Sequence, residues 1–406
     1  VIVCFDGEPS GEVRGKRLFG DANLWRIDLV GGESVDDALA AFNARDDIVF
    51  AARDHRVHVA SITPNDPDFS DLWGLNNTGQ TGGAADADID APEAWETWTT
   101  AMGIEPWNAD SEVVVAVIDS GVDYNHPDLI DKMWSNTEEV AGNGIDDDGN
   151  GYVDDVHHGW DWANNDNDPK DDLSHGTHVA GTIAAVGNNG SGVVGVAPNV
   201  KIMALKFLDN TGYGYTSDAI AALEYAVLNG AQISNNSYID SAADASMDQA
   251  IQAAGEDHLF VAAAGNGVQI LWWVIPNDND ASPRYPASDQ PNPDTVIAVA
   301  ASDHNDNYAD FSNYGASSVD LAAPGVDIWS TVPGGYAYKS GTSMAAPHVA
   351  GAAALIWSTN PELTATQVKG ALLDNTDDIF DSSKPTVTNG RLNVDKALVA
   401  ALALAP

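Results

Sequence analysis

The chain has 406 residues, enough for one large α/β domain and a small second one, because single hydrophobic cores rarely exceed about 250–300 residues. Its 61 acidic and 17 basic residues give a formal net charge of −44. This charge excludes nucleic acid and anionic membrane surfaces as partners, since both would be repelled. Cys4 is the only cysteine in the sequence, so no internal disulfide can form. No apolar run reaches the roughly 18 residues that cross a membrane.

Residues 1–62 predict a small α+β domain. A helix is expected over residues 34–45, with Ser34 as its cap. Three apolar segments predict strands, at residues 1–5, 24–30 and 48–60. A unit of this size is marginally stable on its own. The polar, turn-rich residues 63–90 that follow are typical of a connection between domains or of a segment that wraps a surface.

Residues 63–406 predict a larger α/β domain. From residue 112 onward, short apolar strands alternate with amphipathic helices. The strands are expected within residues 112–119, 200–208, 231–237, 259–266 and 295–303, and helices within 216–230 and 246–258. This alternation predicts a parallel sheet with helices on both faces. In such sheets, catalytic and binding groups gather at the carboxyl ends of the strands.

Three residues stand at strand or helix ends where chemistry is expected. Asp119 closes a buried strand, His175 opens an apolar helix, and Ser343 lies at a helix amino terminus, where developing negative charge is favoured. Singly, Asp119 is explained as a turn cap and His175 as a cap or packing residue. His175 with His178 also suggests zinc, although no acidic residue lies between them as in a helical zinc site. Together the three favour catalysis, because a hydroxyl needs a base, and the base needs an acid to orient it.

Four segments, in this order, resemble the subtilisin-like serine endopeptidases, the subtilase family. They are VIDSGVDYNHPDL (117–129), SHGTHVAGTIAA (174–185), AAAGN (262–266) and SGTSMAAPHVAG (340–351). The resemblance extends from about Thr63 to about Val399. It implies a subtilisin-like α/β fold, with Asp119 as the orienting acid, His175 as the general base and acid, and Ser343 as the nucleophile.

The resemblance also implies an oxyanion site. The side-chain amide of Asn266 would act there together with the backbone N–H of Ser343. The alternative for Asn266 is an ordinary Asn-Gly turn.

Substrate peptides in this family pair as an extra strand between two edges of the enzyme. The resemblance assigns these edges to Gly212, Tyr213 and Gly214, and to Ser237, Tyr238 and Ile239. Such backbone pairing gives affinity with little sequence preference. Ile239 replaces the usual glycine, which leaves the shape of the primary specificity pocket open.

A second departure from the family follows Asn266. Residues 268–283 form a longer and more apolar loop than is usual, and it contains Trp272 and Trp273. The two tryptophans either pack against their own domain or form an exposed contact for substrate or a partner.

The acidic loop at residues 146–155 predicts a calcium site. Its spacing is close to that of an EF-hand loop, with Gly151 at the tight turn. The predicted ligands are Asp146, Asp148, Asn150, Tyr152 and Asp154. His157 stands where an EF-hand has its bidentate glutamate, so an ordinary solvated acidic loop is the alternative. Oxygen ligands without thiols favour Ca²⁺ over zinc.

Two further calcium sites are implied by the resemblance. One resembles the calcium loop of the thermitase branch and would use Asp161, Asp166 and Asp168. The other would combine side chains and backbone carbonyls of Asp66, Asp128, Val186, Asn189, Ser191 and Val193.

Residues 1–62 resemble the inhibitory propeptide of subtilases. The resemblance implies that this segment assists folding, that Ser343 cuts the chain between Val59 and Thr63, and that the fragment then inhibits the enzyme. A permanent, uncut domain is the alternative.

The predicted protein is thus a secreted, calcium-stabilised, monomeric endopeptidase that acts on polypeptides. Two alternatives stay open: a catalytically silent, calcium-bound binding module, and a peptide ligase or cyclase that passes its acyl group to an amine.

Overall fold

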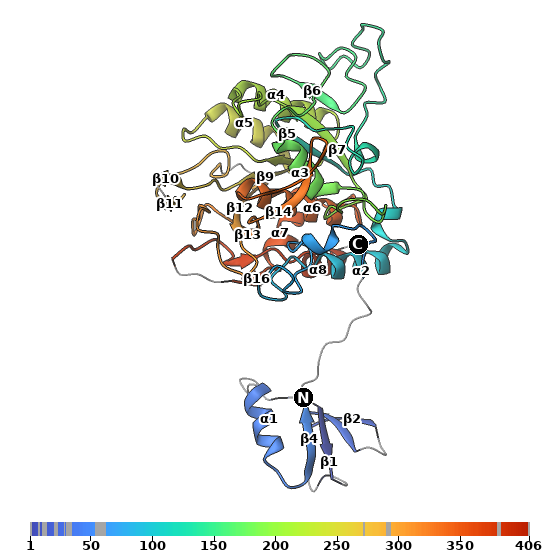
Figure 1. Ribbon diagram of the computed structural model, residues 1–406, viewed down its shortest axis with the longest axis vertical. Helices are drawn as coiled ribbons and strands as arrows, with labels where there is room; N and C mark the ends of the chain where they lie inside the picture. The colour runs from blue at the N-terminus through green and yellow to red at the C-terminus, as the bar shows by residue number, and fades with distance from the viewer. Residues whose placement is uncertain are drawn as a thin grey trace. The chain divides into compact units, whose positions relative to one another are not determined.

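The computed structural model describes residues 2–6, 9, 14–19, 23–27, 29, 35–52, 62–270, 273–289, 294–379 and 383–404. The chain divides into two compact units, Val1–Ser61 and Ile62–Pro406, which Figure 1 shows as ribbons. Among the described helices, none combines the length and the apolar character that a membrane crossing requires.

The smaller unit is an antiparallel sheet of four strands with one helix. The strand order is β2-β3-β1-β4. Val3 and Phe5 are its buried centre, and the helix packs Leu39 and Phe42 against them. The elements are β1 (Ile2–Phe5), β2 (Gly15–Phe19), β3 (Leu24–Ile27), α1 (Val35–Asn43) and β4 (Ile48–Ala52).

The sequence did not predict β2. This strand, GKRLF, carries two cations and is exposed from Gly15 to Leu18, so it lacks the apolar alternation of a half-buried strand. It is held by backbone pairing with β3. The expected cap Ser34 and residues 53–60 of the last predicted strand lie outside the described residues.

The larger unit is built on a sheet of nine strands in the order β16-β17-β13-β12-β9-β8-β5-β7-β6, which runs from the lower to the upper part of this unit in Figure 1. Its neighbouring strands are parallel except for the pair β16–β17 at one edge. The strands are β5 (Val114–Asp119), β6 (Gly159–Asp161), β7 (Lys201–Lys206), β8 (Ile233–Asn236), β9 (Leu259–Ala263), β12 (Val296–Ser302), β13 (Leu321–Pro324), β16 (Asp377–Asp378) and β17 (Gly390–Arg391).

Seven α-helices, four short 3₁₀ turns and two hairpins complete the described part of this unit. The helices are α2 (Ala91–Met102), α3 (His175–Ala184), α4 (Thr216–Leu228), α5 (Ala245–Ala254), α6 (Thr342–Trp357), α7 (Ala365–Leu373) and α8 (Val394–Leu402). The 3₁₀ turns are η1 (Phe69–Asp71), η2 (Pro106–Asn108), η3 (Ile130–Lys132) and η4 (Gly255–Asp257). The hairpins pair β10 (Val268–Ile270) with β11 (Trp273–Ile275), and β14 (Ile328–Val332) with β15 (Gly335–Lys339).

Alternate residues of β5 are buried on opposite faces of the sheet, because successive side chains of a strand point to opposite sides. Val115 and Val117 belong to the core that contains α3 and α6. Ala116 and Ile118 belong to a second core that contains residues of α4 and α5. The predicted α/β sheet with helices on both faces is confirmed.

Helix α6 is buried on all sides, which explains why its sequence lacks a polar face. Every residue from Thr342 to Trp357 is buried except Ser343. Pro347 lies inside the helix and has no N–H to offer the carbonyl of Ser343 four residues earlier, and Ser237 Oγ donates to that carbonyl at 3.0 Å instead. The fold therefore anchors a long apolar helix and leaves one hydroxyl accessible at its amino end.

Candidate active site

Asp119 and His175 form a hydrogen-bonded pair at the carboxyl edge of the sheet. Asp119 is the last residue of β5 and is fully buried, and His175 is the first residue of α3. His175 Nδ1 lies 2.8 Å from Asp119 Oδ1 and 2.9 Å from Oδ2. The carboxylate thus accepts the Nδ1 proton and leaves Nε2 of the neutral ring as the basic atom.

Asp171, which the sequence did not single out, links the two segments that carry this pair. Its Oδ1 accepts hydrogen bonds from Ser120 Oγ and from the backbone of Ser174, each at 2.9 Å. Its Oδ2 accepts from Thr177 N at 2.9 Å. Ser120 Oγ in turn accepts from Gly176 N at 3.0 Å. The residues beside Asp119 and His175 are therefore fixed through one buried carboxylate.

Opposing effects set the pKa of His175. Burial, the largest effect, disfavours the imidazolium and lowers the pKa, whereas the charge of Asp119 and the hydrogen bond to it raise the pKa. Lys339, which donates to Ser174 Oγ at 3.1 Å, also lowers it. The net result is a pKa above the ordinary 6.5. The site therefore favours the protonated ring that forms when His175 accepts a proton.

Ser343 lies at the amino end of α6 against the end of β8. Its Oγ donates to the carbonyl of Ser237 at 3.2 Å, and Ser237 Oγ donates to the carbonyl of Ser343 at 3.0 Å. Strand β8 is the parallel neighbour of β5, with Asn235 opposite Val117, so Ser237 stands level with Asp119. The sheet thereby brings all three predicted catalytic residues to one edge. Rotation of the Ser343 hydroxyl away from Ser237 would free it for a base, a change common on substrate binding.

Asn266 and the backbone N–H of Ser343 border the same small space. Asn266 Oδ1 accepts from Thr342 N at 3.0 Å, which leaves its Nδ2 directed elsewhere. A Cβ built on Gly341 would lie 3.4 Å from Asn266 Nδ2 and 3.7 Å from Ser343 N. The glycine thus keeps open a space beside two N–H donors, which is the arrangement that an oxyanion requires.

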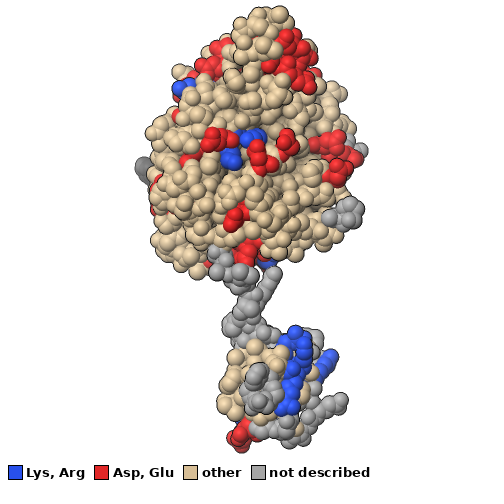
Figure 2. All heavy atoms as spheres, turned by 90° about the vertical axis from the view of Figure 1, so that its right-hand side faces the viewer, with Lys and Arg blue, Asp and Glu red and all other residues tan. Residues whose placement is uncertain are grey.

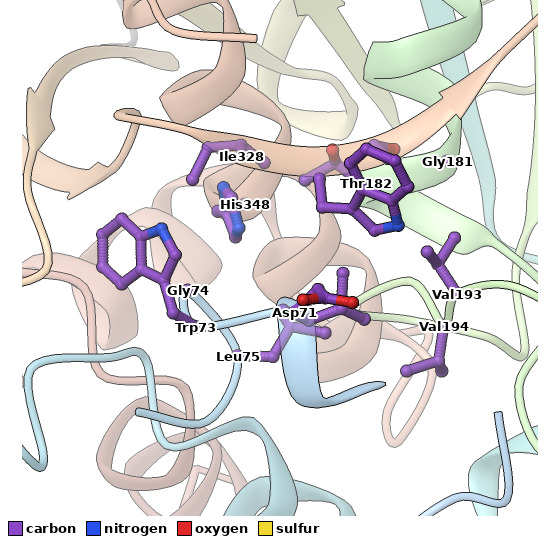
Figure 3. A pocket seen from close by; sticks show the side chains of 13 residues that line it. Asp71, Trp73, Gly74, Leu75, Gly181, Thr182, Val193, Val194, Ile328 and His348 are labelled. Carbon is purple, nitrogen blue, oxygen red and sulfur yellow. The ribbon is translucent and has the colours of Figure 1, made fainter. Parts of the chain in front are cut away.

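The other two histidines near these helices are packing residues. His178 Nε2 lies 2.9 Å from the carbonyl of Ile328, and burial lowers its pKa to about 3. His348 Nδ1 donates to Met344 O at 2.9 Å, and burial lowers its pKa to about 4. Figure 3 shows His348 beside Trp73 and Ile328 at a cavity of about 20 Å³. His178 bonds to backbone carbonyls through Nε2, and among the described residues neither His175 nor His178 belongs to a group of three or more metal-ligating side chains.

The predicted peptide-binding residues line one cavity of about 350 Å³ together with His175. These residues are Gly212, Tyr213, Gly214, Ser237, Tyr238 and Ile239. Gly214 has no room for a side chain, because a Cβ would collide with Phe207 O. Ile239 stands where the family usually has a glycine, and its side chain lies over Gly265. A Cβ built on Gly265 would be 3.3 Å from Ile239 Cγ2. The peptide-binding role of these edges stays a prediction.

The loop between η3 and β6 assembles a carboxylate group that differs from the predicted one. Ligand oxygens of Glu139, Asp148 and Asp155 lie within 4.8 Å of one another, and Glu139 and Asp155 are buried. Of the predicted ligands, Asp154 instead accepts the backbone N–H of Asn143 at 2.9 Å. Glu139 could not be predicted from the sequence, because it precedes residues 146–155, the segment whose spacing resembles an EF-hand loop.

The remaining predicted ligands of this loop make internal hydrogen bonds. Asp146 accepts the backbone N–H of Gly151 at 2.9 Å, as a turn residue does. Asn150 Nδ2 donates to Asp148 Oδ2 and to Asp155 Oδ2, each at 3.0 Å. Tyr152 N donates to Asn150 Oδ1 at 2.8 Å. The calcium role of these residues stays a prediction.

The structure brings Asp66 and Asp128 together at the third predicted cation site. Both are buried, and burial together with the charge of Asp128 raises the pKa of Asp66. Asn189 Nδ2 donates to Asp128 Oδ1 at 2.9 Å and Val193 N donates to Oδ2 at 3.0 Å. Val186 N donates to Asp128 O at 2.9 Å. Ser191 N donates to Asn189 Oδ1 at 2.8 Å.

The second predicted cation loop is more open. Asp161 is buried and Asp166 and Asp168 are exposed. The backbones of Asp161 and Asp166 pair as an isolated bridge, and Asp168 N donates to Asp166 Oδ1 at 3.0 Å. Burial raises the pKa of Asp161.

The apolar insertion after Asn266 forms the hairpin β10–β11, in which Val268 pairs with Ile275. Both of these side chains are exposed. Trp272 and the side chain of Trp273 lie outside the described residues, so the two alternatives for these tryptophans stay open.

A parallel α/β sheet with a buried aspartate bonded to a histidine, and a serine at the amino terminus of a buried helix, is the arrangement found in serine hydrolases. Residues 110–397 match the sequence pattern of Peptidase_S8, the Subtilase family. The chain belongs to the subtilase family and is a subtilisin-like serine endopeptidase.

Two curated relatives and two solved structures show the extent of the similarity. The chain is 37% identical to thermitase of Thermoactinomyces vulgaris, over 83% of this chain and 99% of that protein. It is 38% identical to a thermophilic serine proteinase of Bacillus sp. strain AK1, over 88% and 77% of the two chains. A protease structure from Pseudoalteromonas arctica matches with a TM-score of 0.62 and 30% identity, over 84% of this chain and 100% of that chain. The structure of a cold-adapted subtilisin-like serine proteinase matches with a TM-score of 0.59 and 31% identity, over 80% of this chain and 98% of that chain.

Proposed function

We propose that the chain hydrolyses peptide bonds through Asp119, His175 and Ser343 by way of an acyl-enzyme. The observation that carries this proposal is the position of His175 Nδ1, which lies within 2.9 Å of both carboxylate oxygens of the buried Asp119. His175 Nε2 takes the proton of Ser343 Oγ as that oxygen attacks the substrate carbonyl, and returns it to the leaving amine. Water then attacks the acyl-enzyme with His175 again as the base.

Negative charge on the carbonyl oxygen develops in the space beside Gly341. Asn266 Nδ2 and Ser343 N are the two donors bordering that space, and the amino end of α6 adds its dipole. Donors fixed before the reaction need no reorganisation, which is why such groups lower the barrier.

Labelling and product analysis test this function. A fluorophosphonate should modify Ser343, as located by mass spectrometry of the digested protein, and a catalytically silent module would stay unlabelled. Peptide products formed with and without an added amine separate a hydrolase from a ligase. We expect free carboxylic acids in both reactions, and amide products as the main species would favour the ligase.

The smaller unit is proposed to be an inhibitory propeptide that assists folding. Its buried core is small, and segments of this size are marginal alone. Freshly folded wild-type protein should therefore show a break between Val59 and Thr63 by intact-mass spectrometry, and Ser343→Ala should keep all 406 residues. Adding a trace of active enzyme to Ser343→Ala shows whether cleavage also occurs between molecules. An intact wild-type chain with full activity would contradict processing.

Calcium is proposed to bind the carboxylate groups at Asp66–Asp128 and at Glu139–Asp148–Asp155. Buried like charges need a counter-ion, and these carboxylates and nearby carbonyls are the oxygen ligands that Ca²⁺ prefers. Residues 62–406 carry 10 basic and 50 acidic residues, and Figure 2 shows groups of Asp and Glu on the visible face of the larger unit.

Chelation should consequently lower the melting temperature. A ligand at a hundredfold excess over its Kd stabilises the folded state by about 2.7 kcal/mol per site, and this contribution is lost in EDTA. Salt should restore part of the lost stability, because it screens the repulsion between the acidic residues. Asp128→Asn should lose one equivalent of calcium in titration calorimetry, whereas the exposed control Asp310→Asn should keep all sites. Identical melting curves with Ca²⁺ and with EDTA would contradict calcium binding.

The enzyme is further proposed to act as a secreted monomer, as the family resemblance implies. Sedimentation and fractionation of the producing culture test these two points.

A further inference from the structure

The cavity beside His175 extends past the predicted peptide-binding edges to a wall that carries carboxylates. Within its volume of about 350 Å³, the lining includes Asp240, Asp244 and Asp289 in addition to the two edges. None of the described residues that line it is lysine or arginine. A substrate side chain that enters this space would therefore meet negative charge.

Asp289 differs from the other two carboxylates in its hydrogen bonds. Asp240 Oδ1 accepts from Ala242 N at 3.0 Å, and Asp244 Oδ1 caps α5 by accepting from Ser246 N at 2.8 Å. Asp289 Oδ2 is buried and has no hydrogen-bond partner among the described residues. A buried carboxylate oxygen without a donor is costly, so a missing partner is indicated.

The surroundings of Asp289 favour a cation as this partner. Burial, and then the negative charges of Asp248 and Asp244, raise its pKa to about 7. A positive group beside Asp289 would oppose both effects, since it pairs with the carboxylate and offsets the neighbouring charges.

Most of the other residues that line the cavity are apolar or aromatic. Phe207 and Tyr238 are in edge-to-face contact with ring centroids 4.7 Å apart, and Met247 and Tyr285 also line the space. An apolar wall that ends in a carboxylate matches a long side chain with a methylene stem and a charged tip.

We propose that this space, the acidic pocket, selects a lysine or arginine side chain of the peptide substrate, and that Asp289 pairs with its cation. The proposal rests on the proposed peptidase function. The edge residues Ser237 to Asp240 lead from the contact with Ser343 into the pocket, so the selected side chain belongs to a residue within about four positions of the scissile bond, at roughly 3.3 Å per extended residue.

A matched peptide series tests this. One quenched fluorescent peptide is made with lysine or with norleucine, which keeps the stem and lacks the ammonium group, at each of the four positions on either side of the cleaved bond. At one position, kcat/KM should be about tenfold higher for lysine. Attraction to the acidic surface in general would instead favour lysine similarly at every position.

Variants assign the preference to the pocket. Asp289→Asn should reduce the lysine-to-norleucine ratio of kcat/KM about tenfold at that position, mainly through a lower kcat/KM for lysine. Asp257→Asn, which removes the same charge from exposed η4 outside the pocket, should keep the ratio. If Asp289→Asn does not fold, Asp240→Asn should lower the ratio to a smaller extent.

Two results would overturn the proposal. One is equal kcat/KM for lysine and norleucine at all positions in an enzyme that cleaves both, which leaves the peptidase function intact. The other is an unchanged ratio in folded Asp289→Asn. Failure to cleave any peptide, with Ser343 unlabelled, would overturn the proposed function and this inference together.

Discussion

Ser343→Ala should lower kcat for peptide hydrolysis by roughly 10⁶-fold, because members of a catalytic triad act as a unit and loss of the nucleophile removes the covalent route. The fold should persist, since among the described residues the Ser343 side chain makes one hydrogen bond, to Ser237 O, and lies outside the buried surface of α6. Steady-state kinetics on a quenched peptide and thermal melting measure the two effects.

Ser340→Ala is the matched control. Ser340 precedes the helix, is exposed, and accepts a hydrogen bond from Asp327 N at 2.8 Å, so its loss should leave kcat and fluorophosphonate labelling nearly unchanged. Turnover by Ser343→Ala at a rate near that of the wild type would show that another residue is the nucleophile.

Asp119→Asn should lower kcat by roughly 10⁴-fold, the size of loss typical for the orienting acid of a triad. It should also move the pH profile. In the wild type, the neutral base is lost as pH falls through the His175 pKa, which lies above 6.5. Without the charge of Asp119, burial remains the largest effect on the ring and lowers that pKa, so the acidic limb of residual kcat/KM should shift to lower pH.

Histidine NMR titration and the pH dependence of kcat/KM measure this shift independently. The same pair also affects stability, because the pKa of His175 is higher in the folded state than in the unfolded state. The pair therefore contributes its full stabilisation below the unfolded-state pKa, and this contribution is lost as pH rises through the folded-state pKa. Asp310 is exposed, pairs with Lys384 and is not among the groups that shift the His175 pKa, so Asp310→Asn should leave the limb in place. An unchanged limb in Asp119→Asn would mean that Asp119 does not set the His175 pKa.

The features that the sequence predicts lie within single continuous segments of the chain. Strand β5 reads as an unbroken apolar run because both of its faces are buried, and Asp119 closes it in the same short segment. Helix α6 likewise has a mainly apolar sequence from Thr342 to Trp357, with Ser343 at its amino terminus. Where one segment contains both the structural signal and the chemical group, sequence alone locates the candidate.

Tertiary structure decided what depends on groups far apart in the chain. Asp171 accepts from Ser120, 51 residues away, and Glu139 joins Asp155 from outside the loop spacing. Strand β2 exists because β3 pairs with it and not because of its own apolar pattern.

The acidic pocket shows the same division between sequence and tertiary structure. Asp240 and Asp289 are ordinary polar residues in sequence, and they face one cavity only because β8, α5 and the segment around Tyr285 pack together. The alternation of strands and helices in the sequence was enough to predict the parallel sheet. It also predicted the carboxyl edge of that sheet, where Asp119 and His175 meet. Which carboxylates become buried, unpaired or clustered depends on long-range packing, because burial changes the energy of a charge far more than its neighbours in sequence do.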